Sequence, residues 1–273
     1  MRLTDYERQA QREIERWERG AADSLFTQAL DLAMRPFDWA MDRFVPESLV
    51  DALGEALNAA LGTLNDASEW TYDADDLLAR AREKGIEVER VEDLRDRPLE
   101  ELDRLARSLV SQNALMAALS GGGAGLGGAL FVAADVPVLF TVNFRLIQQI
   151  GAAYGFPMRG PEFKPLVLAI FNVAASGSRE AKSDALRELS VAGAAFAHGS
   201  GYKGRPAQGT FREQVGHVPR EIAKSLAARK LAQMIPVAGA AVGAGVNYWF
   251  TDQTAETALM LFRALYLERK ERV

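Results

Sequence analysis

Two histidines are the first candidates for chemistry, because they flank a loop rich in glycine and basic residues. His198 opens the segment HGSGYKGRPAQG, and His217 follows it. A hydrolytic triad could combine either histidine with Ser200 and Asp184, but the sequence has no nucleophile-elbow motif around a serine. The histidines also lack the H-x-x-x-H spacing of a helical metal site, so no metal is expected. Loop histidines without a catalytic role are the favoured interpretation.

The same loop carries basic side chains beside an aromatic residue. Lys203, Arg205 and Arg212 lie near Tyr202. Clustered cations of this kind can contact a phosphate or a lipid head group. A solvated polar loop is the competing interpretation and is favoured, because charged loop segments are usually hydrated.

A glycine-rich segment matches the residue pattern of the dinucleotide-binding fingerprint, but the sequence around it does not fit such a site. Residues Gly123 to Gly128 fit G-x-G-x-x-G, whose glycines would let backbone amides approach a pyrophosphate. The preceding LVSQNALMAALS favours a helix rather than a strand, and no acidic residue follows at the ribose-binding distance. A P-loop motif is absent from the sequence. We therefore expect no nucleotide or other cofactor, and no nucleic-acid partner.

The glycines are better explained by helix packing. Six of the eight positions from Gly121 to Gly128 are glycine, and each costs about 1 kcal/mol in a helix relative to alanine. Small residues four apart, such as Gly121 and Gly125, let a neighbouring helix approach the bare backbone. The segment MIPVAGAAVGAGVNYWF repeats this spacing at Gly239 and Gly243. We predict two closely packed apolar helical segments.

Whether these segments meet a membrane stays open at this level. No charged residue occurs from Ser108 to Ala134, which reaches the roughly 20 residues that a helical span needs. Asp135 follows directly, and the second segment is shorter and contains Pro236 and Asn247. A buried core hairpin is favoured over reversible peripheral insertion, and constitutive spanning is the least favoured.

Charge is distributed unevenly along the 273 residues. Residues 1–111 contain 15 Lys and Arg against 26 Asp and Glu, a net charge of −11, whereas residues 112–273 contain 17 against 11, a net charge of +6. The sequence has no cysteine, which excludes disulfides and thiolate metal sites. The first twenty residues lack the apolar stretch of a secretory signal, so a cytoplasmic location is expected.

Apolar residues recur at helical spacing along most of the chain. The spacing predicts an amphipathic helix at the N-terminus, on Leu3, Tyr6, Ala10, Ile14 and Trp17. Similar stripes are expected over 26–44, 50–64, 99–109, 144–154, 166–173 and 186–196. Residues 70–98 are expected to be a connector, in which Asp73 is a helix cap or turn residue. The predicted fold is an all-α multi-helix globular bundle, with an acidic N-terminal helical layer over 1–97 and a glycine-rich core over 98–273.

Three segments together resemble the bacterial EcsC family. They are LEELDRLARSLVSQNALMAALSGGGAGLGG, ADVPVLFTVNFRLIQQIGAAYG and IPVAGAAVGAGVNYWF, and the resemblance extends from about Pro98 to Arg269. The acidic N-terminal third is less typical of the family and is interpreted as an added helical layer. The family's signature positions fall on Asp135, Pro137, Arg145, Tyr154, Gly155, Pro236, Gly239 and Asn247.

The resemblance implies membrane proximity rather than a particular reaction. The family's namesake is encoded beside the components of an ABC transporter, and a similar pattern occurs in helical domains attached to some bacterial GTPases. The expectation is therefore a non-enzymatic cytoplasmic protein, peripheral on the inner membrane, with membrane lipid or a transporter complex as partner. Two alternatives stay open: a hydrolase with a site near Asp135, Arg145, His198 and His217, and a homo-oligomeric or partner-binding scaffold packed through Gly121, Gly125, Gly128 and Gly243.

Overall fold

The all-α prediction is confirmed over the part of the chain that the computed structural model describes. The described residues are 3–19, 46–63, 72–125, 129–156, 158, 163–176, 179–197, 220, 222–227 and 239–271. Within these ranges the chain contains helices and connecting turns and no β-strand. The helices are α1 (Asp5–Glu18), α3 (Glu47–Thr63), α4 (Ala74–Glu83), η1 (Val91–Asp96), α5 (Leu99–Gly125), α6 (Ala129–Ala153), α7 (Phe163–Ala175), α8 (Arg179–Ala197) and α10 (Gly239–Glu271).

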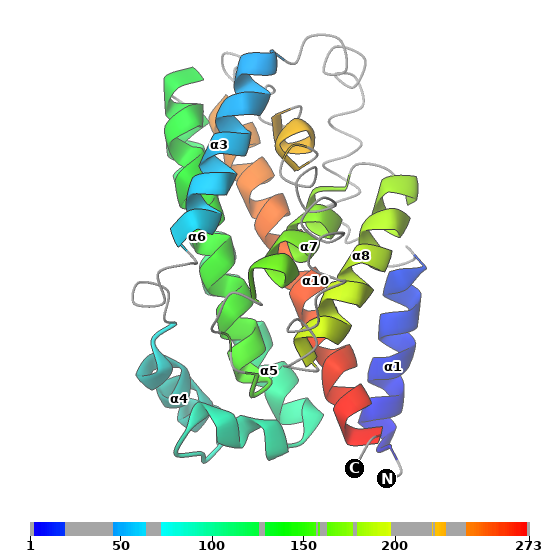
Figure 1. Ribbon diagram of the computed structural model, residues 1–273. Coiled ribbons are helices and arrows are strands. Elements are labelled where there is room, and N and C mark those ends of the chain that lie inside the picture. Colours follow the sequence, from blue (N-terminus) through cyan, green and yellow to red (C-terminus); the bar gives the residue numbers. More distant parts are fainter. Residues whose placement is uncertain are drawn as a thin grey trace.

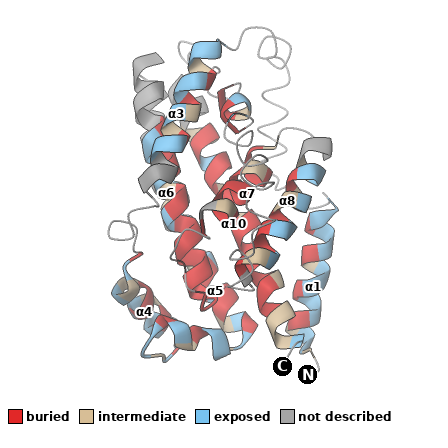
Figure 2. Ribbon diagram, in the orientation of Figure 1, coloured by how far each residue is buried: buried red, intermediate tan, exposed pale blue. Residues whose placement is uncertain are grey.

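Helix α10 is the central element of the bundle. It packs most extensively along α5 and also contacts α6, α7, α8 and α1. Figure 1 shows α10 running through the middle, with both termini at one end of the molecule. Figure 2 shows that α10 is buried along most of its length, whereas α1 and α3 each keep one exposed face. The antiparallel pair α5 and α6 flanks α10, and the ends that adjoin residues 126–128 lie opposite the termini (Figure 1).

The N-terminal helices follow the apolar spacing of the sequence. In α1, Ala10, Ile14 and Trp17 are buried, and in α3, Val50 and Leu53 are buried. Helix α1 begins at a capping box: the Thr4 hydroxyl accepts from the Glu7 amide at 3.2 Å, and the Glu7 carboxylate accepts from the Thr4 amide at 2.8 Å. Both contacts satisfy amides that have no partner within the helix. The helix predicted over 26–44 lies outside the described residues.

The expectation of a connector over 70–98 is wrong in part. The segment contains α4, because Asp73 caps a helix with a buried face that includes Leu77 and Ala81. The Asp73 carboxylate accepts from the amides of Asp75 and Asp76. Asp73 therefore acts as a helix cap, one of the two roles expected of it. The alternation of Ile86 and Val88 belongs to a loop rather than a strand.

A glycine in the left-handed region ends α6. Gly155 has φ 73°, its amide donates to the Ala152 carbonyl at 2.8 Å, and the next amide, of Phe156, donates to the Gly151 carbonyl at 3.1 Å. This pair of bonds is the Schellman arrangement, which requires a residue without a Cβ penalty at the position of Gly155. The helix expected over 144–154 therefore ends within one residue of its expected limit.

Helix α5 continues as helix through Gly121 and Gly125, so a helix and not a strand precedes the G-x-G-x-x-G match. Helix α10 begins at Gly239 and includes Gly243. The surroundings of these four glycines lie outside what the structure describes. Their role in close packing therefore stays a prediction.

Candidate functional site

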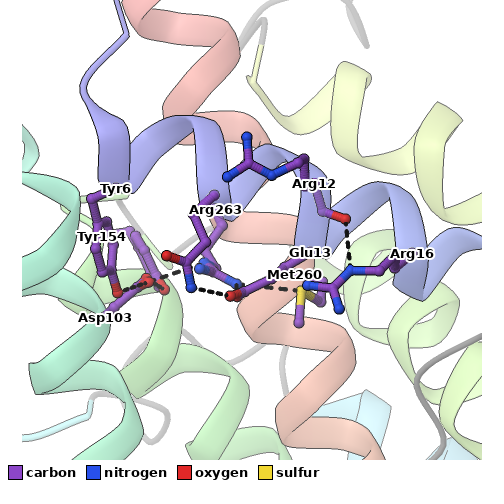
Figure 3. Close-up of polar contacts among 9 residues, drawn as sticks. Tyr6, Arg12, Glu13, Arg16, Asp103, Tyr154, Met260 and Arg263 are labelled. Carbon is purple, nitrogen blue, oxygen red and sulfur yellow. Dashed lines mark hydrogen bonds and ion pairs between the residues drawn. The ribbon is translucent and has the colours of Figure 1, made fainter.

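A group of buried and half-buried polar side chains lies at the end of the bundle that carries the termini. We call it the Asp103–Arg263 cluster and define it as Tyr6, Glu13, Asp103, Tyr154 and Arg263. These residues come from α1, α5, the residue after α6, and α10 (Figure 3). Asp103 is 1% exposed and Arg263 is 2% exposed. Burying two opposite charges is costly unless they are paired and hydrogen-bonded, so their contacts decide what the cluster does.

Asp103 is saturated by its neighbours. The Tyr6 hydroxyl donates to Oδ2 at 2.7 Å, and the Tyr154 hydroxyl donates to Oδ1 at 2.5 Å. Arg263 Nε lies 3.0 Å from Oδ2 as an ion pair, although its N–H is not aligned for a hydrogen bond. Both carboxylate oxygens therefore have partners inside the bundle.

Arg263 links this carboxylate to the N-terminal helix. Its Nη1 donates to Glu13 Oε2 at 2.9 Å and also lies 3.7 Å from Met260 Sδ. Burial lowers the pKa of the guanidinium, but Asp103 and the hydrogen bond to Glu13 raise the pKa, and the net change is upward. Arg263 therefore stays a cation between two carboxylates.

The two tyrosines keep their protons. Burial, followed by the charge of Asp103 and the hydrogen bond to it, raises the pKa of Tyr154 well above its usual value. Burial and the hydrogen bond to Asp103 raise the pKa of Tyr6 to about 12. A phenol with a raised pKa is a poor acid at neutral pH, so both hydroxyls remain donors to Asp103.

The cluster can join elements, but its geometry does not favour catalysis. It ties α1, α5, the end of α6 and α10 to one carboxylate and one guanidinium, and both of these groups are closed to solvent. A general acid or base must reach a proton of its substrate within hydrogen-bonding distance. Among the described residues, no group of three or more histidine or acidic side chains has metal-binding geometry. The arrangement is suited to holding these helices together.

A second charged contact holds α1 on α10. Lys270 Nζ donates to Glu7 Oε1 at 2.5 Å, and Glu7 is buried. Burial raises the pKa of Glu7, but the hydrogen bonds from Lys270 and Thr4 lower the pKa by more, and the net change is downward. The pKa of Glu13 is lowered in the same way, because the hydrogen bonds from Gln9 and Arg263 outweigh its burial.

Acidification is expected to weaken the docking of α1. A carboxylate whose pKa is lower in the folded state stabilises the fold above its unfolded pKa, here 4.5, and that contribution is lost as the pH falls through the folded value. We expect the free energy of unfolding to fall less for the variant Glu7→Gln/Glu13→Gln than for the unmodified chain as the pH is lowered from about 5.5 to about 3. Urea unfolding followed by circular dichroism measures the difference. Identical pH dependence in the two proteins would contradict the assignment.

A small groove lies beside the cluster, between α1, α8 and α10. Its volume is about 170 Å³, and its walls are mainly aliphatic, with Trp17, Glu18 and Glu268 among the lining residues. The one hydroxyl in the lining, that of Ser190, donates to the Leu186 carbonyl of its own helix at 3.0 Å rather than to a base, so the described groove shows no activated nucleophile.

The structure places the predicted signature residues in different environments. Tyr154 and Gly155 lie together at the end of α6, and Tyr154 belongs to the Asp103–Arg263 cluster. Asn247 is buried in α10, whereas Pro137 and Arg145 are exposed on α6. The side chain of Asp135 lies outside the described residues.

Other predicted site residues fall outside the described part of the chain. They are Gly128, His198, Lys203, Arg205, Arg212, His217 and Pro236. The hydrolase site and the basic head-group site therefore stay predictions.

Sequence reasoning missed four members of the cluster: Tyr6 as a polar contact, Glu13, Asp103 and Arg263. A signal for one of them was present, because Arg263 is the sole charge in the otherwise apolar run from Ala258 to Leu267. A charge within an apolar helical run indicates a buried partner. Which residue supplies that partner is not encoded in local spacing.

Comparison with known proteins identifies relatives over nearly the whole chain. The model of the EcsC protein family matches residues 8–267. The uncharacterized protein YdbA of Bacillus subtilis (strain 168) is 24% identical over 254 residues, which cover 92% of this chain and 89% of that protein. Protein EcsC of the same organism is 28% identical over 170 residues, covering 62% of this chain and 66% of that protein. No solved structure matches the chain.

The extent of the family match corrects one expectation. The resemblance read from the sequence began near Pro98, whereas the match begins at residue 8, within α1. The acidic N-terminal third is therefore part of the matched length. Within the matched range, Glu13 of this third accepts a hydrogen bond from Arg263 of α10.

Proposed function

The chain belongs to the EcsC protein family, and we propose that this member is a non-enzymatic helical protein that associates peripherally with the cytoplasmic membrane. The contact surface in this proposal is the end of the α5–α6 pair that adjoins residues 126–128. We call it the hairpin end and define it by Leu115, Leu119 and Val138. The exposure of these three side chains is the observation that carries the proposal.

The exposed face of α5 changes from charged to apolar along the helix. Arg104, Arg107, Ser111, Leu115 and Leu119 are all exposed and follow each other at steps of three and four. Leu115 is 60% exposed and Leu119 is 71% exposed. Residues at this spacing share one face, so α5 presents a stripe that becomes apolar toward the hairpin end.

The exposed face of α6 changes in the same direction. Arg145, Thr141 and Val138 are exposed at steps of four and three, and Val138 is 47% exposed. Since α6 runs antiparallel to α5, the described exposed charges of both helices lie toward the termini and the described exposed aliphatic side chains lie toward the hairpin end (Figure 1). Asp135, whose side chain lies outside the described residues, is the one acidic residue of α6 between Val138 and the hairpin end. Paired faces that become apolar together suit insertion into an apolar phase better than isolated surface leucines would.

The energetics favour a peripheral contact. Removing a large aliphatic side chain from water stabilises the bound state by about 1.5–3 kcal/mol. The sequence adds no charge from Ser108 to Ala134 that would oppose burial in lipid. Among the helices that the structure describes, none combines the length and hydropathy that a bilayer crossing needs.

The non-enzymatic part of the proposal is supported by the Asp103–Arg263 cluster. Its central pair, Asp103 and Arg263, is closed to solvent, and the hydroxyls of Tyr6 and Tyr154 donate to the two oxygens of Asp103. The cluster fixes α5 and α6 at the end opposite the hairpin end. Its role in the proposal is to hold the base of the hairpin.

Replacing the exposed leucines is expected to reduce membrane binding. We expect the full chain to float with phospholipid vesicles and Leu115→Gln/Leu119→Gln to lose at least about tenfold in partitioning, because each leucine contributes about 1.5–3 kcal/mol and about 1.4 kcal/mol is tenfold. Vesicle flotation with quantified bound fractions measures the effect. Val191→Gln is the matched control, since Val191 is 60% exposed on α8, and it should bind like the unmodified chain.

Two outcomes would overturn the proposal. Full-length protein that stays unbound with every vesicle composition contradicts membrane association. A concentration-dependent dimer in light scattering that Leu115→Gln/Leu119→Gln abolishes, without flotation, assigns the hairpin end to a second copy of the chain instead.

A further inference from the structure

We infer that the groove between α1, α8 and α10 binds a linear aliphatic diamine, with one ammonium group at Glu18 and the other at Glu268. This site is separate from the hairpin end and goes beyond the proposed function. Three observations carry the inference: the groove is small and elongated, its walls are apolar, and its two charged lining residues are carboxylates that lie toward opposite ends.

The groove has the volume of a small molecule and the length of about two helical turns. Its volume is about 170 Å³, and its lining on α10 extends from Met260 to Glu268. At 1.5 Å per residue this stretch is about 12 Å long. A cavity of about 150 Å³ holds one benzene molecule, so the groove admits a ligand of about six to eight non-hydrogen atoms. Atoms that are spread over this length form an unbranched chain rather than a ring.

The walls of the groove are apolar between the two carboxylates. Ile14 and Trp17 of α1 and Leu265 of α10 are buried residues that line it. The hydroxyl of Ser190 in the α8 wall already donates to the carbonyl of Leu186. Methylene groups of a ligand are favoured against such walls because they leave water, whereas a charge placed there would lose its hydration without a partner.

The two carboxylates lie toward opposite ends of the groove. Two ion pairs set the direction of α1 along α10: Glu7 with Lys270, and Glu13 with Arg263. Residue numbers therefore rise along α1 as they fall along α10, and the two helices are antiparallel (Figure 1). Glu18, the last residue of α1, lies toward Met260, whereas Glu268 lies toward the termini. Because glutamate side chains are flexible and reach inward, a chain of about five carbons between two ammonium groups spans a groove of about 12 Å.

The charges of the groove favour a cation. Glu18 is exposed and Glu268 is half-buried, and the lining contains no basic side chain. Two nearby cations lie outside the lining and pair with a carboxylate one turn earlier: Arg19 with Glu15 at 3.7 Å, and Arg187 with Asp184 at 2.6 Å. A carboxylate attracts an ammonium group and repels an anion, so an anionic ligand is disfavoured here. A diamine places one charge at each carboxylate and its methylene groups against the apolar walls.

Calorimetric titration of the full chain with three ligands tests the site. The ligands are 1,5-diaminopentane, pentylamine, which lacks one ammonium group, and glutarate, which carries two carboxylates on a chain of the same length. We expect pentylamine to bind about two- to fivefold more weakly than the diamine, because an ion pair that is open to water contributes modestly. Glutarate should not bind, because both of its charges would meet carboxylates.

Three variants separate the groove from the net charge of the protein. Glu18→Gln/Glu268→Gln should remove the preference for the diamine over pentylamine. Glu15→Gln/Glu271→Gln is the matched control, since it removes two exposed carboxylates outside the lining from the same two helices, and it should retain the preference. Ala264→Leu fills the floor of the groove without changing its charge and should weaken both amines by at least about fivefold.

Each alternative result overturns the inference. Equal affinity of the unmodified chain for the diamine and for pentylamine shows that the two carboxylates do not act together, and this comparison needs no variant. An equal loss of the preference in the two glutamine variants assigns it to net charge rather than to the groove. Absence of binding by both amines leaves the proposed function intact, because vesicle flotation measures the hairpin end.

Discussion

Arg263→Met is expected to lower the free energy of unfolding by about 3–5 kcal/mol, because it leaves the Asp103 carboxylate buried without its cationic partner. Asp103 is 1% exposed, so water cannot replace the guanidinium without opening the bundle. Methionine keeps much of the volume of the arginine stem, and the loss therefore reports the charge rather than a cavity. Urea unfolding at neutral pH, followed by far-UV circular dichroism, gives the difference.

The double variant Asp103→Leu/Arg263→Met separates the charge from the packing. With both charges removed, no ion is stranded, and we expect the double variant to be more stable than Arg263→Met alone. The double variant should regain only part of the free energy of unfolding that Arg263→Met loses, because the hydroxyls of Tyr6 and Tyr154 lose the acceptor they share. If Arg263→Met lowers the free energy of unfolding by less than about 1 kcal/mol, the ion pair is solvated and the cluster does not hold the helices together.

The helices that the sequence predicted best are those with a regular apolar stripe. Ala10, Ile14 and Trp17 are buried on one face of α1, as their spacing requires. The end of α6 could also be predicted from the sequence, because a glycine that follows an apolar helical stripe and closely precedes a proline indicates a C-cap. These features depend on residues within a few positions of one another.

The Asp103–Arg263 cluster could not be predicted in the same way. Tyr6, Asp103 and Arg263 are separated by most of the chain, and they meet because α1 and α5 both pack against α10. Local spacing assigns Tyr6 and Tyr154 to apolar faces, which is correct, but it does not indicate where their hydroxyl groups point.

The cluster and the hairpin end occupy opposite ends of the α5–α6 pair. Asp103 and Tyr154 lock the two helices together at one end, and Asn113 Nδ2 donates to Gln149 Oε1 at 3.1 Å partway along. Leu115 and Leu119 follow beyond this bond. A pair of helices fixed at its base presents its free end in one orientation, which reduces the conformational entropy lost when that end binds a surface.

Gly155→Ala is expected to destabilise the protein by about 3 kcal/mol, the combined effect of a left-handed backbone and an overpacked contact. Gly155 has φ 73°, and a Cβ at this position would lie 2.4 Å from the backbone nitrogen of Arg95 in η1. Backbone atoms cannot turn aside as a flexible side chain can. The methyl group would therefore push η1 away from α6 and displace Tyr154 from Asp103.

Gly85→Ala is the matched control for this substitution. Gly85 has φ 76°, nearly the same as Gly155, but no atom lies within 4 Å of the Cβ that alanine would add. Gly85→Ala should lower the free energy of unfolding by about 1–2 kcal/mol, which is the cost of placing alanine in a left-handed backbone conformation. The difference between the two variants in thermal or urea unfolding isolates the contact with Arg95. Equal losses would show that η1 moves freely and does not hold Tyr154 in place, which would leave Asp103 and Arg263 to fix the base of the hairpin without support from η1.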